Sequence, residues 1–234
     1  RIRVPSDDPA ATSHSMRLHS DLTHTQQHRA NIVSALSWLE ATDAVLNEAG
    51  QALQRAKELG VYGANSVLTD DARHALAQEV HQIIQHMVDL ANSSHAGLYL
   101  FSGTETLSKP YEVTLGPDGS ISVSPYQGDN AERRYEIASG VTIDVNVVGS
   151  DVFGDVEGAG NTTGIFGAVT KLYNALSDPD NWNPLTQEAL AELDDALDGL
   201  LRVRADVGAR ANRLELAGAR MHELELNVEQ LIHD

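Results

Sequence analysis

The sequence has no cysteine, few aromatic residues and no long apolar run. Because none of its 234 residues is cysteine, the chain forms no disulfide and offers no thiolate for catalysis or metal binding. No stretch of about 18 consecutive apolar residues occurs, so we expect no membrane-spanning helix. Aromatic residues make up only 5% of the chain. This scarcity favours helices packed on helices over a deep aromatic pocket.

Basic residues are also scarce. Lys and Arg total 16 against 34 Asp and Glu, which gives a formal net charge of −18. A protein that binds a nucleic-acid backbone or an anionic membrane needs a basic face, and none is evident here. Hydrophobic residues at 41% are enough for a folded core. The charge suits a protein whose copies stay apart until they assemble.

Apolar residues recur at every seventh position toward the end of the chain. They are Leu193, Leu200, Val207, Leu214, Met221 and Val228. A second series three residues on consists of Ala196, Val203, Arg210, Ala217, Leu224 and Leu231. This spacing predicts a long helix packed against another helix. Arg210 interrupts the second series, either as a side chain that reaches water at the bundle edge or as a register-setting group paired with an acidic neighbour.

The same two-position pattern occurs near the start. Its first series is Ile32, Leu39, Leu46 and Leu53, and its second is Ala35, Thr42, Ala49 and Ala56. We therefore expect a long helix that ends at about Leu59, before Gly60 and Gly63. A second amphipathic helix should follow, capped by Thr69 or Asp70 and ending near Gly97.

The composition changes after Gly97. Short β-branched segments separated by Gly, Pro and Asp predict strands, and these segments are 98–101, 111–115, 120–124, 133–137 and 141–148. Residues 149–164 are glycine-rich and predict a loop, residues 165–176 a short helix, and the last long helix should begin near Thr186. The predicted fold is therefore α+β: an elongated helical bundle, or rod, built from both ends of the chain, with a small inserted β-rich domain. The expected domains are 1–105, 106–160 and 161–234.

No group of residues predicts an active site, a cofactor site or a metal site. His24 and His28 have the spacing of two ligands on one helix face, but no further ligand motif accompanies them. The glycine-rich stretch 158–164 does not fit a dinucleotide fingerprint, and 178–183 does not fit a calcium loop. Neighbouring carboxylates such as Asp194 and Asp195 point to different faces of a helix. We expect no catalytic residue, no cofactor and no metal.

Several short segments resemble the flagellin-like family of flagellar hook-associated proteins. The first is the turn at 4–11, with Ser6, Asp7, Asp8 and Pro9. The second is 97–104, with Tyr99, Phe101, Ser102 and Gly103, followed by Lys109-Pro110-Tyr111. Further segments are 126–129, 149–153 and 208–214. Together they span most of the chain, and their order and spacing make the resemblance specific.

The resemblance implies a structural protein of the bacterial flagellum, at the junction between hook and filament. It implies export through the flagellar type III apparatus to an extracellular location. The implied partners are hook-associated protein 1, flagellin, other copies in a ring, and a flagellar export chaperone. In the family, terminal segments become coiled coil on assembly. The resemblance implies that these segments are absent from both ends of this sequence, so we expect it to be a core fragment.

Two other functions remain open. The first is flagellin itself, the filament subunit, which shares related terminal helices. The second is a ligand-binding or receptor-binding module on a helical stalk, formed by the β-rich insert. The sequence gives that second function little support, because Tyr111, Tyr126 and Tyr135 are dispersed.

Overall fold

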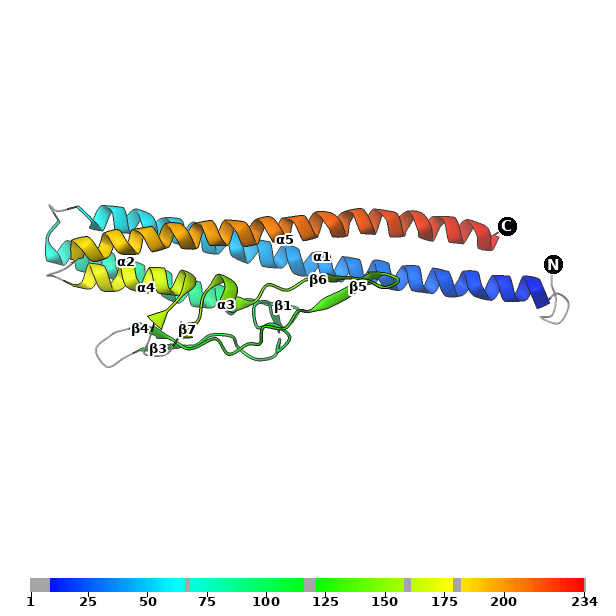
Figure 1. Ribbon diagram of the computed structural model, residues 1–234, viewed down its shortest axis with the longest axis horizontal. Coiled ribbons are helices and arrows are strands. Elements are labelled where there is room, and N and C mark those ends of the chain that lie inside the picture. The colour runs from blue at the N-terminus through cyan, green and yellow to red at the C-terminus, as the bar shows by residue number, and fades with distance from the viewer. Residues whose placement is uncertain (1–8, 66–67, 116–120, 158–160, 179–181, 234) are drawn as a thin grey trace. The chain divides into compact units, whose positions relative to one another are not determined.

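The structure is a computed structural model that describes residues 9–65, 68–115, 121–157, 161–178 and 182–233 (Figure 1). Its contacts divide the chain into two compact units. Unit 1 comprises Arg1–Leu39, Arg134–Val145 and Ala209–Asp234, and unit 2 comprises Glu40–Arg133 and Asn146–Gly208. The two longest helices each contribute to both units. The domain boundaries at 105 and 160 stay a prediction.

Helices dominate the described residues. They are α1 (Pro9–Gly63), α2 (Asp70–Ala91), α3 (Gly149–Val152), α4 (Gly164–Ser177) and α5 (Trp182–His233). The two long helices predicted from the heptad patterns are α1 and α5. The first extends four residues past the predicted end, and the second begins four residues before Thr186. Thr69 caps α2 as predicted, because its hydroxyl accepts a hydrogen bond from the Ala72 N–H at 3.3 Å.

In the described parts of the chain, the strands form four separate antiparallel hairpins. They pair β1 (Ser94–His95) with β2 (Leu98–Tyr99), β3 (Val113–Leu115) with β4 (Ile121–Val123), β5 (Arg134–Ala138) with β6 (Val141–Asp144), and β7 (Val156–Glu157) with β8 (Asn161–Thr162). The α+β class is confirmed, and its β part is a set of hairpins.

Three details of the sequence prediction were wrong. Helix α2 ends at Ala91 instead of near Gly97, because a hairpin whose two turn residues, Ala96 and Gly97, have positive φ occupies the intervening stretch. Strand β6 ends at Asp144 instead of Val148. Residues 149–164 are not simply a loop, since they hold α3, β7 and β8.

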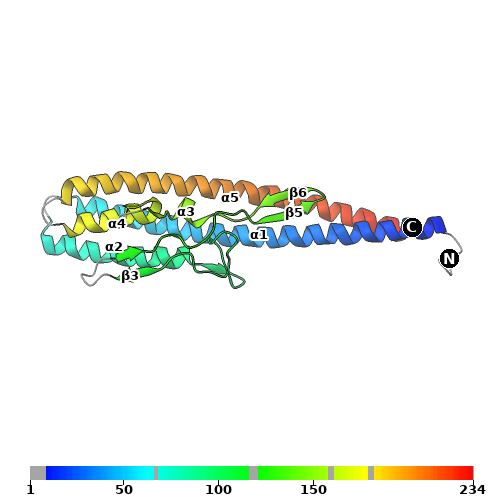
Figure 2. The same ribbon diagram turned by 60° about the horizontal axis from the view of Figure 1, so that its bottom comes forward.

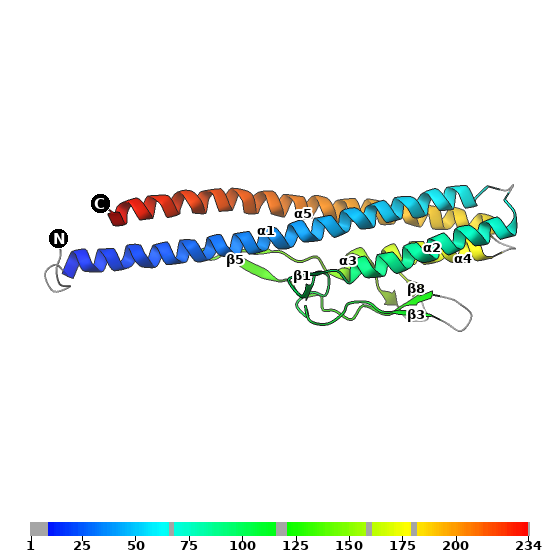
Figure 3. The same cartoon turned by 180° about the vertical axis from the view of Figure 1, so that it is seen from behind.

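Unit 2 packs segments of four helices around the first heptad series. Figures 1 and 3 show α2 and α4 side by side. Helix α1 lies against α5, where a Cβ added at Gly50 would lie 3.3 Å from the Leu200 side chain. The seam residues of this unit are almost completely buried, and they are Leu46, Leu53, Leu193, Leu200 and Val207. Burying such a side chain is worth about 1.5–3 kcal/mol, so this seam holds the helices together.

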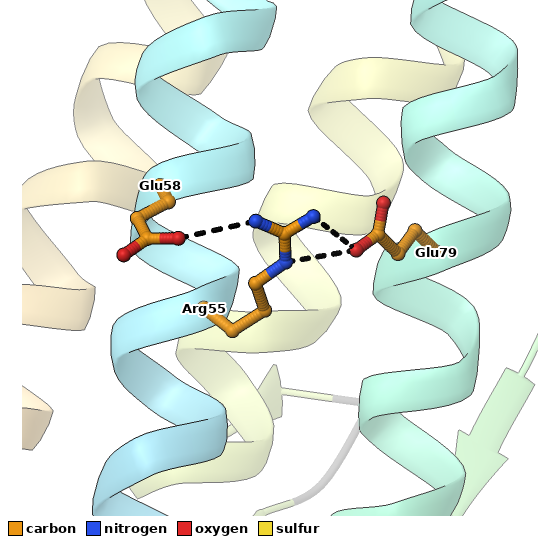
Figure 4. A network of polar contacts seen from close by, with 3 residues as sticks. All are labelled: Arg55, Glu58 and Glu79. Atoms are coloured by element: carbon orange, nitrogen blue, oxygen red, sulfur yellow. Dashed lines mark hydrogen bonds and ion pairs between the residues drawn. The ribbon is translucent and has the colours of Figure 1, made fainter.

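Ion pairs surround that apolar core. The guanidinium of Arg55 in α1 donates to Glu79 in α2 at 2.6 and 2.8 Å and to Glu58 at 3.1 Å (Figure 4). Arg204 in α5 donates to Asp43 in α1 at 2.9 Å. Lys57 pairs with Asp194 between the same two helices. These side chains lie at or near the surface, so they contribute more to register than to stability.

Unit 1 consists of the first part of α1, the last part of α5 and the β5–β6 hairpin (Figure 2). Ile32, Leu214 and Met221 are buried between the helices. The hairpin is attached through its backbone, since Asn31 Nδ2 donates to the Glu136 carbonyl at 2.8 Å. Arg210 donates to the carbonyl of Asp144 at 3.3 Å. This hydrogen bond ties the seam arginine to the backbone of β6, a contact that the sequence pattern did not predict.

Among the described residues, no helix combines the length and apolarity needed to cross a membrane.

Candidate functional site

Segments that carry the family resemblance meet in unit 2, around five aromatic rings. This aromatic cluster consists of Phe101, Tyr111, Tyr126, Phe153 and Phe166. The ring centroids of Phe101 and Phe153 lie 5.0 Å apart, and those of Tyr111 and Tyr126 lie 5.5 Å apart. The expectation that Tyr111 and Tyr126 are dispersed was wrong, because segments distant in sequence fold together here.

Hydrogen bonds to backbone carbonyls lock the cluster. Tyr111 donates its hydroxyl to the Gly154 carbonyl at 2.8 Å. The Tyr126 hydroxyl lies 2.8 Å from the carbonyl of Phe101 and 3.0 Å from that of Asp129. The fully buried Tyr111 and the half-buried Tyr126 thus each have an acceptor for the phenol, as a polar group removed from water requires. The backbone of the motif at 97–104 is thereby tied to the motif at 126–129.

Asp129 fixes the turn that follows Gly103. Its carboxylate accepts hydrogen bonds from the backbone N–H and the hydroxyl of Thr104. The hydrogen bond from the Thr104 hydroxyl is the main reason why the pKa of Asp129 lies below its ordinary value. Gly103 has φ of +70°, and a Cβ there would collide with Asp129. This turn therefore requires glycine at 103.

The electrostatics of the cluster suit packing and do not favour proton transfer. Burial raises the pKa of Tyr126 to about 12 and raises that of Tyr111 as well. Both phenols are therefore neutral at physiological pH and act as hydrogen-bond donors. Four of the five rings are fully buried and only Tyr126 is half-buried, so the cluster offers little open aromatic surface to a ligand. This argues against the ligand-binding interpretation of the insert.

The other predicted motif residues take different positions. Ser102 is fully buried, and its hydroxyl has no hydrogen-bond partner among the described residues. Tyr99 is half-buried on β2. Ser6, Asp7 and Asp8 lie outside the described residues, and Pro9 is the first residue of α1.

The predicted seam residues are mostly covered by their own chain. Ile32 and Leu39 of α1 are at most 3% exposed. The seam opens toward the end of α5, where Met221 is buried, Val228 is half-buried, and Leu224 and Leu231 are 41% and 59% exposed. Their role in assembly stays a prediction.

Unit 1 exposes large apolar side chains on both of its helices. We call this set the unit 1 apolar surface, and it consists of Met16, Val33, Leu216, Leu224, Leu226 and Leu231. Single exposed leucines are ordinary. Here six large apolar side chains, four of them leucine, are exposed on two helix segments of one unit. No sequence pattern singled out Met16, Val33, Leu216 and Leu226, because they lie off the heptad seams.

The described residues do not bring together a metal site. No group of three or more His, Asp or Glu side chains in those ranges could hold an ion. The His28 ring lies 3.4 Å from the Glu136 carbonyl, as part of the contact between α1 and β5. His24 and His28 therefore gain no third ligand from the fold.

Comparison with known proteins gives the relationship. Residues 1–106 match the family described as the bacterial flagellin N-terminal helical region. Flagellar hook-associated protein 3 of Escherichia coli K12 is 28% identical over 224 residues, which cover 92% of this chain and 71% of that protein. The chain is thus similar to flagellar hook-associated protein 3 along most of its length. The protein of that name from Salmonella typhimurium is 26% identical over 231 residues, with coverage of 92% and 70%.

Solved structures show the hook-associated protein 3 fold directly. Hook-associated protein 3 of Legionella pneumophila has a TM-score of 0.79 at 19% identity and covers 93% of this chain and 98% of its own. A Vibrio parahaemolyticus structure described as a flagellar hook-associated protein reaches 0.84 at 24% identity, with coverage of 99% and 100%. Bacillus cereus flagellin reaches 0.56 at 19% identity, with coverage of 82% and 88%. The fold thus agrees better with these hook-associated proteins than with that flagellin.

Proposed function

We propose that this protein is a structural component of the bacterial flagellum that joins the hook to the filament. The observation that carries the proposal is its homology to flagellar hook-associated protein 3 over 92% of the chain. The fold supports it, because the residues of the resembling segments 97–104, 126–129 and 149–153 form one packed core. Flagellin is the alternative, and the lower TM-score of the flagellin structure disfavours it.

The role that fits this chain is structural and not catalytic. Both phenols of the aromatic cluster are neutral at physiological pH, and the other three rings of the cluster are fully buried. Binding would instead come from helix burial. Each apolar side chain covered by a partner is worth about 1.5–3 kcal/mol, less the entropy lost on ordering the partners. The unit 1 apolar surface supplies several such side chains.

The partners that follow are flagellar. The chain would contact hook-associated protein 1 on the hook side and flagellin on the filament side, with other copies beside it in a ring. Export by the flagellar type III apparatus, helped by a chaperone, would bring it to its extracellular place. The name of its homologues supports the flagellum, and the individual partners are our proposal.

Deletion of the gene that encodes this chain tests the proposal. A junction protein is needed for filament attachment and not for hook assembly or flagellin synthesis. Deleted cells should therefore carry hooks without filaments and shed flagellin into the medium, and the restored gene should return both filaments and swimming. Bare hooks without flagellin in the medium would favour the flagellin alternative. Filaments that stay attached would refute both.

A further inference from the structure

An open hollow in unit 2 is lined by α3, α4 and α5. Its volume is about 450 Å³. Val152, Ala196 and Leu200 give it an apolar lining, and Gly199 adds no side chain, with open space where a Cβ would stand. Ala196 belongs to the second heptad series but is only half-buried. The seam of α5 is thus incompletely covered here and leaves room for a medium-sized apolar side chain.

Two carboxylates without ion-pair partners border this hollow. Lys171 also lines it, but its ammonium already pairs with Glu192 and lies 3.8 Å from Glu188. Asp151 and Asp195 are exposed and take part in no ion pair within the described parts of the chain. The mouth of the hollow therefore has unpaired negative charge and would attract a positively charged side chain.

A turn elsewhere in unit 2 presents a side chain of the kind that the hollow could receive. Leu107 has the most exposed large apolar side chain among the described residues, at 82%. Its turn is held by the Ser108 N–H, which donates to the Glu105 carbonyl at 3.0 Å, and by the Tyr99 N–H, which donates to the Thr106 carbonyl at 2.8 Å. The turn thus presents Leu107 in a fixed conformation, which lowers the entropy lost on binding.

A lysine stands beside this leucine. Lys109 is exposed and has no ion pair within the described residues, while Pro110, which follows it, is buried and anchors the chain. The turn therefore carries one apolar side chain and one positive charge, two residues apart. The hollow carries an apolar lining and negative charges at its mouth.

We propose that the hollow receives the Leu107 turn of a second copy of this chain. Leu107 would enter between Ala196 and Leu200, and Lys109 would meet Asp151 and Asp195. Because copies of a chain with net charge −18 repel one another, a contact of opposite charges is a favourable place for them to meet. Turn and hollow are different surfaces, so the contact is head-to-tail and repeats from copy to copy around a ring or along a helix. The proposal deepens the proposed function and rests on it for the ring.

Cross-linking tests this contact, because the natural chain has no cysteine. One copy carries Leu107→Cys and a differently tagged copy carries Gly199→Cys, and the two are mixed under mild oxidation. The matched control replaces Gly199→Cys with Gly208→Cys, which also stands on α5 with open space around it. We expect several-fold more mixed dimer with Gly199→Cys than with the control. Equal yields would overturn the proposal.

Charge reversal supplies a second test. Rescue by the double variant distinguishes loss of the contact from misfolding of a single variant. Lys109→Glu or Asp195→Lys alone should lower the cross-linking yield about two- to fivefold, as for other exposed ion pairs, and the two together should restore it. Failure of the double variant to restore the yield would refute the predicted pairing. The same pairs should cross-link in isolated flagella. If the deletion phenotype holds and no cross-link forms, this contact is wrong while the junction function stands.

Discussion

At the scale of single residues, unit 2 is organised by side chains that bond to distant backbone. Asn92 and Tyr111 exchange two hydrogen bonds, of 2.9 and 3.0 Å, between the end of α2 and the hairpin region. The Tyr126 N–H donates to Asp155 at 2.8 Å. Such contacts join segments that are 19 and 29 residues apart. They explain why short segments with no common periodicity belong to one core.

Gly149 should not tolerate a methyl group. A Cβ there would lie 2.7 Å from the Phe101 carbonyl and 2.9 Å from the Tyr126 ring. We expect Gly149→Ala to lower the free energy of unfolding by about 1–3 kcal/mol, as overpacking does elsewhere. Gly208→Ala is the control and should raise it by up to about 1 kcal/mol, because Gly208 is exposed and helical. Urea denaturation measures both, and equal stabilities would contradict the packing described.

The raised pKa of Tyr126 predicts an alkaline limit to stability. The folded state keeps the phenol protonated up to about pH 12, whereas the unfolded phenol ionises near its ordinary value of 10. The contribution of the protonated Tyr126 phenol to the free energy of unfolding is thus complete below pH 10 and is lost as the pH rises through about 12. Tyr126→Phe should make the decline of stability between pH 10 and 12 shallower in thermal melts. If Tyr126→Phe leaves the decline of stability with pH unchanged, the fold does not raise the pKa of Tyr126 as described.

At the scale of elements, the heptad seam outweighs the ion pairs around it. Leu53 is 1% exposed, whereas Arg55, two residues along α1, is half exposed. Glu79 raises the pKa of Arg55, with a smaller contribution from Glu58. Solvent and salt screen these charges. The apolar seam therefore decides whether α1 packs.

Two substitutions compare these contributions on one helix. Leu53→Ala should destabilise unit 2 by about 2–5 kcal/mol, because it leaves a cavity in the core. Arg55→Gln should cause a much smaller loss, which 1 M salt should remove. Chemical denaturation at low and high salt checks both. A loss from Arg55→Gln as large as that from Leu53→Ala would overturn this ranking.

The sequence predicted elements that rest on local periodicity. The heptad series correctly indicated two long helices, because a helical seam repeats along the chain. The series from Leu193 to Val228 indicated α5, and the series from Ile32 to Leu53 indicated α1. The sequence missed the aromatic cluster, because Tyr111 and Tyr126 meet through turns that bring residues together over long sequence distances. It also missed Leu216 and Val33, which no seam includes. Whether these side chains are buried or exposed depends on tertiary packing, which a local sequence pattern does not give.

At the scale of the whole molecule, a subunit that assembles needs surfaces that its neighbours cover. Leu216 is 74% exposed and belongs to the unit 1 apolar surface. The fold resembles the hook-associated proteins through most of the chain. Burial of exposed apolar side chains by neighbours is the force that would hold such a subunit in place. A substitution at an exposed apolar side chain should therefore impair assembly and leave the fold intact.

Leu216→Ser should leave the isolated protein as stable as before, because its side chain is already in water. It should reduce incorporation into flagella, since a buried contact with a neighbour is lost. Leu201→Ser is the control, because Leu201 is 52% exposed on the same helix but belongs to unit 2. Quantitative immunoblots of isolated flagella give the ratio of incorporated to secreted protein. Equal incorporation of both variants would contradict a role for this surface.

The position of the protein in the flagellum distinguishes a junction protein from a filament subunit. Gold-labelled antibodies against this chain can be located on isolated flagella by electron microscopy. The junction function predicts label in one narrow band between the hook and the filament. Label along the whole filament would identify a flagellin, and the absence of label from flagella would contradict the account.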